Sequence, residues 1–194
     1  MADTGEIRPQ SQSGFNSSGA NVIDDTVLAD DNTAGSAFMF SGATATVFVS
    51  DFTGTDLPAG ATVNGVEIFL KAGFAFSQCT TTTFVGKGGA GGSFGGTTVS
   101  QNLSVASGAS TTVYTQGSNS QTWGVSWSGF TDLTDLAVKV TSVRTDGGTG
   151  TSILGVFAIR AKVYYTEAAS PDVISTLTLK GGITTIKGGN VTIK

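Results

Sequence analysis

Histidine does not occur in this 194-residue chain, and cysteine occurs once, as Cys79. Without histidine there is no Ser-His-Asp or Cys-His pair to activate a nucleophile, and the commonest zinc and iron ligand sets are excluded. A single cysteine cannot form a disulfide within the chain. We therefore expect Cys79 to be an ordinary strand or loop residue rather than a catalytic thiol.

Charged residues and long apolar runs are also scarce. Only 12% of the residues are charged, against about 25% in typical soluble domains, and no apolar run approaches the roughly 18 residues that a membrane-spanning helix needs. The net charge is −4, whereas a nucleic-acid-binding protein needs a basic stripe. These features argue against membrane and nucleic acid as partners. Two explanations of the uncharged surface stay open: partner proteins cover it, or Ser and Thr hydroxyls hydrate it.

The first residues of the chain do not resemble a secretory signal peptide. Residues 1–6 have neither a basic start nor an apolar stretch. Together with the single cysteine, this predicts synthesis in a reducing cytoplasm without export by the general secretory route.

What the sequence does contain is a succession of short β-prone runs separated by Gly-rich turns. Over residues 66–76 the even positions are apolar and the odd positions include Glu67 and Lys71, which is the alternation of a strand with one buried face. The alternation recurs over 136–141 and 153–166. In the last run the residues expected on the buried face are Ile153, Phe157, Ile159, Ala161, Val163 and Tyr165. Seven or eight strands and no helical periodicity predict an all-β fold, an antiparallel β-sandwich of the jelly-roll type.

The sandwich is expected to span residues 21–167, with an extended arm at each end. Residues 1–20 are polar, rich in Ser, Gly and Gln, and without periodicity. Residues 168–194 contain a seven-residue unit in which a β-prone run is followed by Lys and Gly-Gly. Gly pairs disfavour a coiled coil, whereas Thr, Ile and Val favour strands and Gly-Gly favours turns.

Strands as short as those of the C-terminal arm cannot bury a face by themselves. We therefore expect this arm to pair with another chain; the alternative is that it folds back onto its own sandwich. The residues expected to carry the contact are Leu177, Leu179, Ile183, Ile186, Val191 and Ile193, while Lys180, Lys187 and Lys194 stay in solvent or meet acidic groups of the partner.

Three motifs link the sandwich region to a known group of proteins. They are the run from Pro58 to Glu67, the pair Trp123-Gly124 with Trp127, and Val163-Tyr-Tyr165. Through these motifs, roughly residues 25–167 resemble a β-sandwich domain that recurs in tailed-bacteriophage virion proteins. Such domains occur in head decoration proteins, head fibres and tail parts. The resemblance therefore implies a structural virion protein without choosing among these roles.

Two of the shared features have a physical interpretation that needs no ligand. Gly65 is expected where a turn feeds the long strand, since a residue without Cβ suits a close approach. Trp123 and Trp127 are four residues apart, which puts both on one face if the segment is extended. We favour core or rim packing for them, and a sugar-stacking platform is the alternative.

Two other patterns suggest chemistry but lack its context. Gly86-Lys-Gly-Gly-Ala-Gly91 matches G-x-G-x-x-G, yet β-prone residues follow it where a dinucleotide site needs a helix. The carboxylate pairs are Asp24 with Asp25, Asp30 with Asp31, and Asp132 with Asp135. They lie in polar turns or loops, where Asp commonly bonds its own backbone, and EF-hand spacing is missing. We expect no catalytic residue, metal site or cofactor; glycoside hydrolysis and a calcium site are less favoured alternatives.

The preferred interpretation is a non-enzymatic bacteriophage structural protein, a capsid decoration or cement protein on the outside of the virion. It would be made in the host cytoplasm, form a homotrimer and bridge major capsid subunits through its arms by strand addition. The alternative is a tail-fibre, baseplate or head-fibre module that binds carbohydrate on a host surface. A carbohydrate-directed enzyme or binding module is a third hypothesis.

Overall fold

The computed structural model describes residues 1–24, 35–75, 78–89, 93–104, 112–145, 147, 149–150, 152–169, 174–179 and 182–187. The strands are β1 (Ala2–Asp3), β2 (Arg8–Asp24), β3 (Gly35–Thr53), β4 (Thr62–Ala75), β5 (Gln78–Lys87), β6 (Ser93–Phe94), β7 (Val99–Ser104), β8 (Thr112–Gly117), β9 (Leu136–Arg144), β10 (Ser152–Thr166), β11 (Ile174–Leu179) and β12 (Gly182–Lys187). A short 3-10 helix, η2 (Leu133–Asp135), precedes β9. All the strand pairings are antiparallel.

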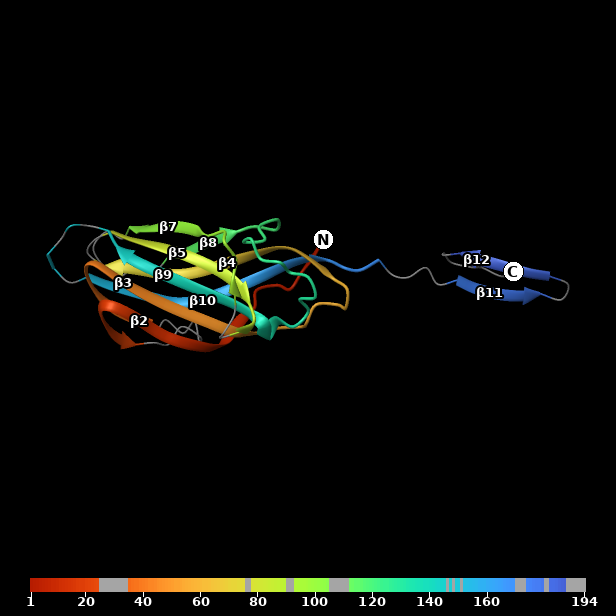
Figure 1. Ribbon diagram of the computed structural model, residues 1–194, viewed down its shortest axis with the longest axis horizontal. Helices are drawn as coiled ribbons and strands as arrows, with labels where there is room; N and C mark the ends of the chain where they lie inside the picture. The colour runs from red at the N-terminus through yellow and green to blue at the C-terminus, as the bar shows by residue number, and fades with distance from the viewer. Residues whose placement is uncertain are drawn as a thin grey trace.

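The main body is a sandwich whose two layers are joined through one long strand (Figure 1). The strand order is β6-β5-β9-β3-β10-β4-β8. The first part of β3 pairs with β10, with Phe38 opposite Ile153, and its second part pairs with β9, with Val47 opposite Val140. Gly42, at a φ of +73°, lies between the two parts. A strand that changes layer at such a bend forms the corner of a sandwich, so the predicted all-β sandwich is confirmed.

The alternation predicted for the long core strand β4 is also confirmed. Val66, Ile68 and Leu70 are completely buried, while Glu67 and Lys71 are half-buried on the outer face. Buried side chains of both layers belong to one hydrophobic cluster. Burial of apolar surface at roughly 25 cal/mol per Å² is the main stabilising contribution to this body.

The face predicted for β10 is correct only in its second half. Ile159, Ala161 and Val163 are buried as expected, but Phe157 is half-buried and its neighbour Val156 is completely buried. The pairing of β10 with β4 shifts between Val156 and Ala158, so Phe157 is the extra residue of a β-bulge. An extra residue exchanges the two faces of a strand, because side chains alternate with a period of two.

The first 20 residues, which the sequence predicts as an arm, are extended but pair along the sandwich. β1 pairs with the end of β10, and the amide of Ile7 donates to the carbonyl oxygen of Ala161 at 2.8 Å. β2 then pairs with β3 from Arg8 to Asp24. Since β3 pairs with β10 only up to Val156, residues 2–7 fill the edge that β10 would otherwise leave open.

β11 and β12 form a second, two-stranded sheet. Thr176 lies opposite Thr185, and the two strands are joined across positions 180–181. Figure 1 shows this hairpin beyond the end of the sandwich. Within the described part of the chain, neither strand pairs with the sandwich. We call β11 and β12 the C-terminal hairpin.

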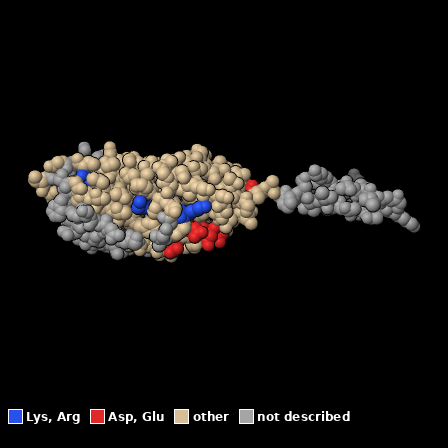
Figure 2. Space-filling view, in the orientation of Figure 1, with Lys and Arg blue, Asp and Glu red and all other residues tan. Residues whose placement is uncertain are grey.

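A row of hydroxyl groups crosses the outer face of the layer that contains β3, β9, β5 and β7. Thr46, Thr141, Thr82 and Ser100 lie side by side across the four strands. Their hydroxyls pair at 3.2 Å between Thr46 and Thr141 and at 3.1 Å between Thr82 and Ser100. Figure 2 shows that uncharged side chains predominate on the face it presents. Hydroxyl groups are thus present on this layer, and both explanations of the low charge stay open.

Candidate functional site

A long connection, residues 118–132, joins β8 to η2 without regular secondary structure. Loops of this length without secondary structure are uncommon inside a compact domain, and they are usually either functional or disordered. The connection is held by buried groups: the indole of Trp123 is completely buried, and its Nε1 donates to the carbonyl oxygen of Val66 at 2.8 Å. Backbone bonds also join Val66 to Gln121 and Leu57 to Thr131. We call residues 118–132 the tryptophan loop.

Glycines allow the tryptophan loop to approach the neighbouring backbone closely. A Cβ at Gly65 would lie 2.4 Å from the carbonyl oxygen of Ser118, which confirms the close approach predicted there. A Cβ at Gly95 would lie 1.9 Å from the carbonyl oxygen of Trp123. Trp123 itself has a φ of 58°, a conformation that costs a non-glycine residue about 1–3 kcal/mol. The surrounding contacts therefore fix the loop in an unfavourable backbone conformation.

The predicted packing role of the two tryptophans is confirmed. Trp127 is only 6% exposed, and its Nε1 donates to the carbonyl oxygen of Thr122 at 3.0 Å. Its ring packs edge-on against that of Phe130, with the ring centroids 4.9 Å apart. The segment turns at Trp123 and Gly124 rather than running extended. The two indoles therefore do not form an exposed sugar-stacking platform.

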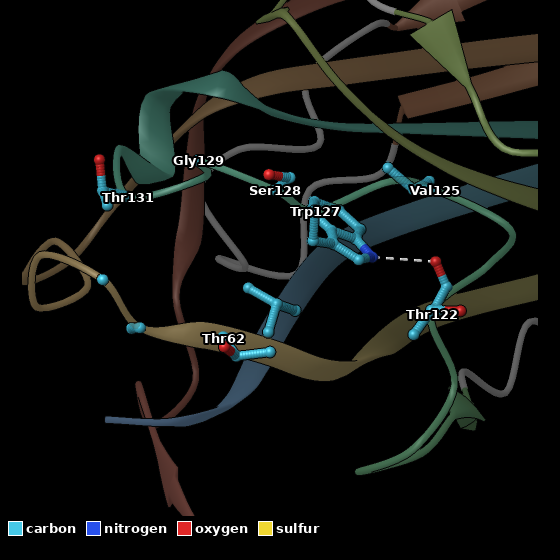
Figure 3. Close-up of a pocket in the computed structure, with 10 residues that line it drawn as sticks. Thr62, Thr122, Val125, Trp127, Ser128, Gly129 and Thr131 are labelled. Atoms are coloured by element: carbon cyan, nitrogen blue, oxygen red, sulfur yellow. Dashed lines mark hydrogen bonds between the residues drawn. The ribbon is translucent and has the colours of Figure 1, made fainter. Parts of the chain in front are cut away.

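A pocket of about 480 Å³ nevertheless opens beside Trp127 (Figure 3). One wall comes from the start of β4 and the turn before it, and the other comes from the tryptophan loop. The lining residues are Gly60, Ala61, Thr62, Val63, Thr122, Val125, Trp127, Ser128, Gly129 and Thr131. The close-up shows Trp127 in the middle, with Thr62 on one side and Thr122 at the end of the dashed hydrogen bond. The pocket therefore combines hydroxyl and backbone groups with one aromatic ring.

A second hollow, of about 210 Å³, shares the lining residue Val125 with the first pocket. Its lining residues are Lys87, Ser93, Phe94, Gly95, Gly124, Val125 and Ser126. Lys87 reaches toward the first pocket, because its Nζ donates to the carbonyl oxygen of Ser128 at 3.3 Å. Val125 and the bond from Lys87 to Ser128 therefore connect the two hollows.

The carboxylates singled out in the sequence have structural roles where they are described. Asp132 caps η2: its carboxylate accepts from the amide of Thr134 at 2.8 Å and from the hydroxyl of Thr134 at 2.6 Å. These bonds hold the pKa of the exposed Asp132 carboxyl below its ordinary value. Asp24 ends β2, whereas positions 25, 30 and 31 lie outside the described residues. Among the described residues, no group of three or more Cys, Asp or Glu could hold a metal ion.

The glycine-rich run beginning at Gly86 does not precede a helix. Gly86 pairs with Phe94 of β6, and the amide of Gly88 donates to the carbonyl oxygen of Asp135 at 2.8 Å. Positions 90–92 lie outside the described residues. The described glycines thus hold the end of β5 against β6 and η2.

The predicted interface residues fall partly on the C-terminal hairpin. Leu177 and Leu179 lie on β11, and Ile183, Ile186 and Lys187 lie on β12. The register places Leu177 opposite Thr184 and Ile186 opposite Ser175. Lys180, Val191, Ile193 and Lys194 lie outside the described residues. Their contact with a partner stays a prediction.

Nothing in the sequence signalled the two hollows, because they depend on contacts between β4, β6 and the tryptophan loop. The nearest signal was the pair Trp123 and Trp127, which marked the loop correctly but suggested only packing or an exposed platform. In the described part of the chain, no helix has the length and apolar character needed to cross a membrane.

No protein-family model and no curated protein matches the sequence. Among solved structures, the enzymatically active domain of tailspike protein 4 from bacteriophage CBA120 is similar at 12% identity and a TM-score of 0.38, over 80% of this chain and 19% of that one. This chain therefore spans about a fifth of the tailspike structure.

Two structures of the family 11 carbohydrate-binding module from Clostridium thermocellum are also similar. One, in complex with a β-1,3-1,4-mixed-linked tetrasaccharide, has 15% identity and a TM-score of 0.42, over 83% of this chain and 96% of that one. The other, from the cellulosomal cellulase Lic26A-Cel5E, has 12% identity and a TM-score of 0.35, over 86% of this chain and 89% of that one. TM-scores this low assign neither a family nor a function to the chain.

Proposed function

We propose that the protein is a non-enzymatic structural component of a bacteriophage particle that attaches through its C-terminal hairpin. The observation that carries this proposal is the separate sheet of β11 and β12. Within the described residues the two strands pair only with each other, so each has one unpaired edge of backbone N–H and C=O groups. A two-stranded hairpin is marginally stable alone, and an unpaired edge accepts a strand from another chain.

The specific role we propose is that of a capsid decoration or cement protein. Strand addition by the hairpin would connect the sandwich to major capsid subunits through backbone hydrogen bonds. Several copies, arranged as a homotrimer on the capsid exterior, would multiply weak contacts into strong attachment. The phage assignment itself rests on the sequence resemblance described above.

Deletion of residues 168–194 tests the attachment. We expect the truncated protein to keep the circular dichroism spectrum and melting temperature of the sandwich, but to be lost from purified particles. Thr176→Pro combined with Thr185→Pro should have the same effect, because the substitutions remove amides from opposite positions of the hairpin. Ser100→Ala on the outer face of the sandwich is the control, because Ser100 lies on β7, which pairs with β5 and not with the hairpin.

Undiminished incorporation of either hairpin variant would contradict the proposal. The copy number on a stained gel of purified particles then separates the possible roles. Hundreds of copies indicate a decoration protein, and a few or a few dozen indicate a fibre or baseplate component.

A second candidate function is a fibre or baseplate module that binds carbohydrate on a host surface. The observation that favours it is the pocket beside Trp127, which offers hydroxyl groups and an aromatic ring within a loop fixed by buried contacts. Such a loop limits the entropy lost on binding. Both candidates use the hairpin for attachment and differ in what the sandwich does.

A further inference from the structure

We propose that the two hollows beside the tryptophan loop form one groove that binds an acidic oligosaccharide. The inference deepens the second candidate function, that of a carbohydrate-binding module, and does not depend on what the hairpin attaches to. Val125 lines both hollows, so they are neighbours across a single side chain. An oligosaccharide is elongated, and it can occupy both hollows with successive sugar units.

A fixed aromatic ring lines the second hollow. Phe94 is half-buried and meets the ring of Phe48 edge-on at a centroid distance of 5.8 Å. The Nζ of Lys139 lies 4.7 Å from the centroid of Phe94 and 4.2 Å from that of Phe84. These contacts hold the ring in place, as a sugar-contacting aromatic requires.

Hydroxyl and backbone groups supply the polar part of the groove. Thr62, Thr122 and Ser128 are exposed in the first hollow, and Ser93 and Ser126 are exposed in the second. Hydroxyls both donate and accept hydrogen bonds, which matches the hydroxyl groups of a sugar. A few placed polar groups on a largely preformed surface are typical of small-ligand sites.

The charge of the groove favours an acidic sugar over a neutral one. Lys87 lines the second hollow and donates to Ser128 of the first, which places its ammonium group near their junction. Among the described residues that line the two hollows there is no Asp or Glu, and Lys139 lies over the ring of Phe94. Among the described residues, the interactions of Lys87 include no ion pair. An ammonium group that has no carboxylate partner in such a site attracts one from a ligand.

Titration calorimetry with acidic trisaccharides tests the inference. The panel holds galacturonic, glucuronic and sialic acid trisaccharides, each with its methyl ester, which keeps the shape and removes the charge. We expect at least one acid to bind the full chain and its ester to bind at least about tenfold more weakly, the usual effect of losing a charge-assisted hydrogen bond. Lys87→Met should weaken the binding of that acid by a similar factor. Ser126→Trp, which fills the second hollow, should abolish binding.

Lys162→Met provides the matched control, because Lys162 lies on β10 near Tyr164 and lines neither hollow. It should leave the affinity unchanged. No binding by any acid of the panel, equal affinity for acid and ester, or equal losses from Lys87→Met and Lys162→Met would overturn the inference. Incorporation of Lys87→Met into particles should equal that of the wild type, so failure of the groove and failure of the hairpin attachment give different results.

Discussion

At the scale of single residues, burial determines what Cys79 can do. The side chain is 1% exposed on β5, and this burial raises the pKa of its thiol to about 12, although hydrogen bonds with Ser142 and Val143 act in the opposite direction. A thiol that stays protonated is a poor nucleophile. The sequence predicted an ordinary residue from the lack of histidine, and the structure confirms it for a different reason, the burial of the strand.

The same pKa predicts how stability depends on pH. The pKa of the folded thiol lies above its ordinary value of 9.0, so below pH 9 neither state is ionised and stability is unaffected. Between pH 9 and 12 only the unfolded state loses the proton, and the free energy of unfolding falls by up to about 1.4 kcal/mol per pH unit.

Urea unfolding of the wild type and of Cys79→Ala across this range isolates the effect from that of other titrating groups. We expect the free energy of unfolding of the wild type to fall relative to that of Cys79→Ala as the pH rises above 9. Parallel curves would mean that the thiol is accessible to solvent in the native state.

At the scale of elements, the tryptophan loop depends on its glycine contacts. Gly95→Ala would push a methyl group against the Trp123 carbonyl, and the forced backbone shift should lower the free energy of unfolding by about 1–3 kcal/mol. At Gly96 a Cβ would meet nothing within 4 Å. Gly96→Ala should therefore change stability by no more than about 0.5 kcal/mol.

Urea unfolding of these two variants gives the comparison, and quenching of tryptophan fluorescence reports on the loop itself. Gly95→Ala should expose Trp123 more than Gly96→Ala does. Equal stability of the two variants would show that the loop tolerates the displacement and is not fixed by this contact.

At the scale of the whole molecule, the two ends of the chain contribute differently. Ile7 is 3% exposed and bridges to Ala161, and the Arg160 guanidinium pairs with the Glu6 carboxylate at 2.6 Å. The C-terminal hairpin pairs with neither layer of the sandwich within the described residues. The N-terminal segment is thus part of the fold, and the hairpin is an appendage to it.

Deleting residues 1–7 should therefore destabilise the sandwich, while deleting residues 168–194 should not. Loss of the buried Ile7 side chain alone should lower the free energy of unfolding by about 2–5 kcal/mol. Differential scanning calorimetry of the two truncated proteins makes the comparison. A lower melting temperature after the C-terminal deletion would mean that the hairpin packs on its own sandwich.

The sequence by itself determined the fold class and the main core strand. Its alternation over 66–76 fixes which face of β4 is buried, because side chains alternate along any strand. The Thr- and Ile-rich runs after position 168 likewise favour strands by local propensity, and β11 and β12 lie there. The buried face of β10, in contrast, changes at Phe157, and only the pairing with β4 shows the bulge.

The tertiary structure alone decided the place of residues 1–20 and the positions of the two hollows. A polar segment without periodicity carries no local sign that it will pair with the edge of β10. That edge is open only beyond Val156, where β3 no longer pairs with β10. The two hollows lie between β4, β6 and the tryptophan loop, which are far apart in the sequence. Local patterns report which residues are buried in a strand, whereas sites between distant segments arise from packing.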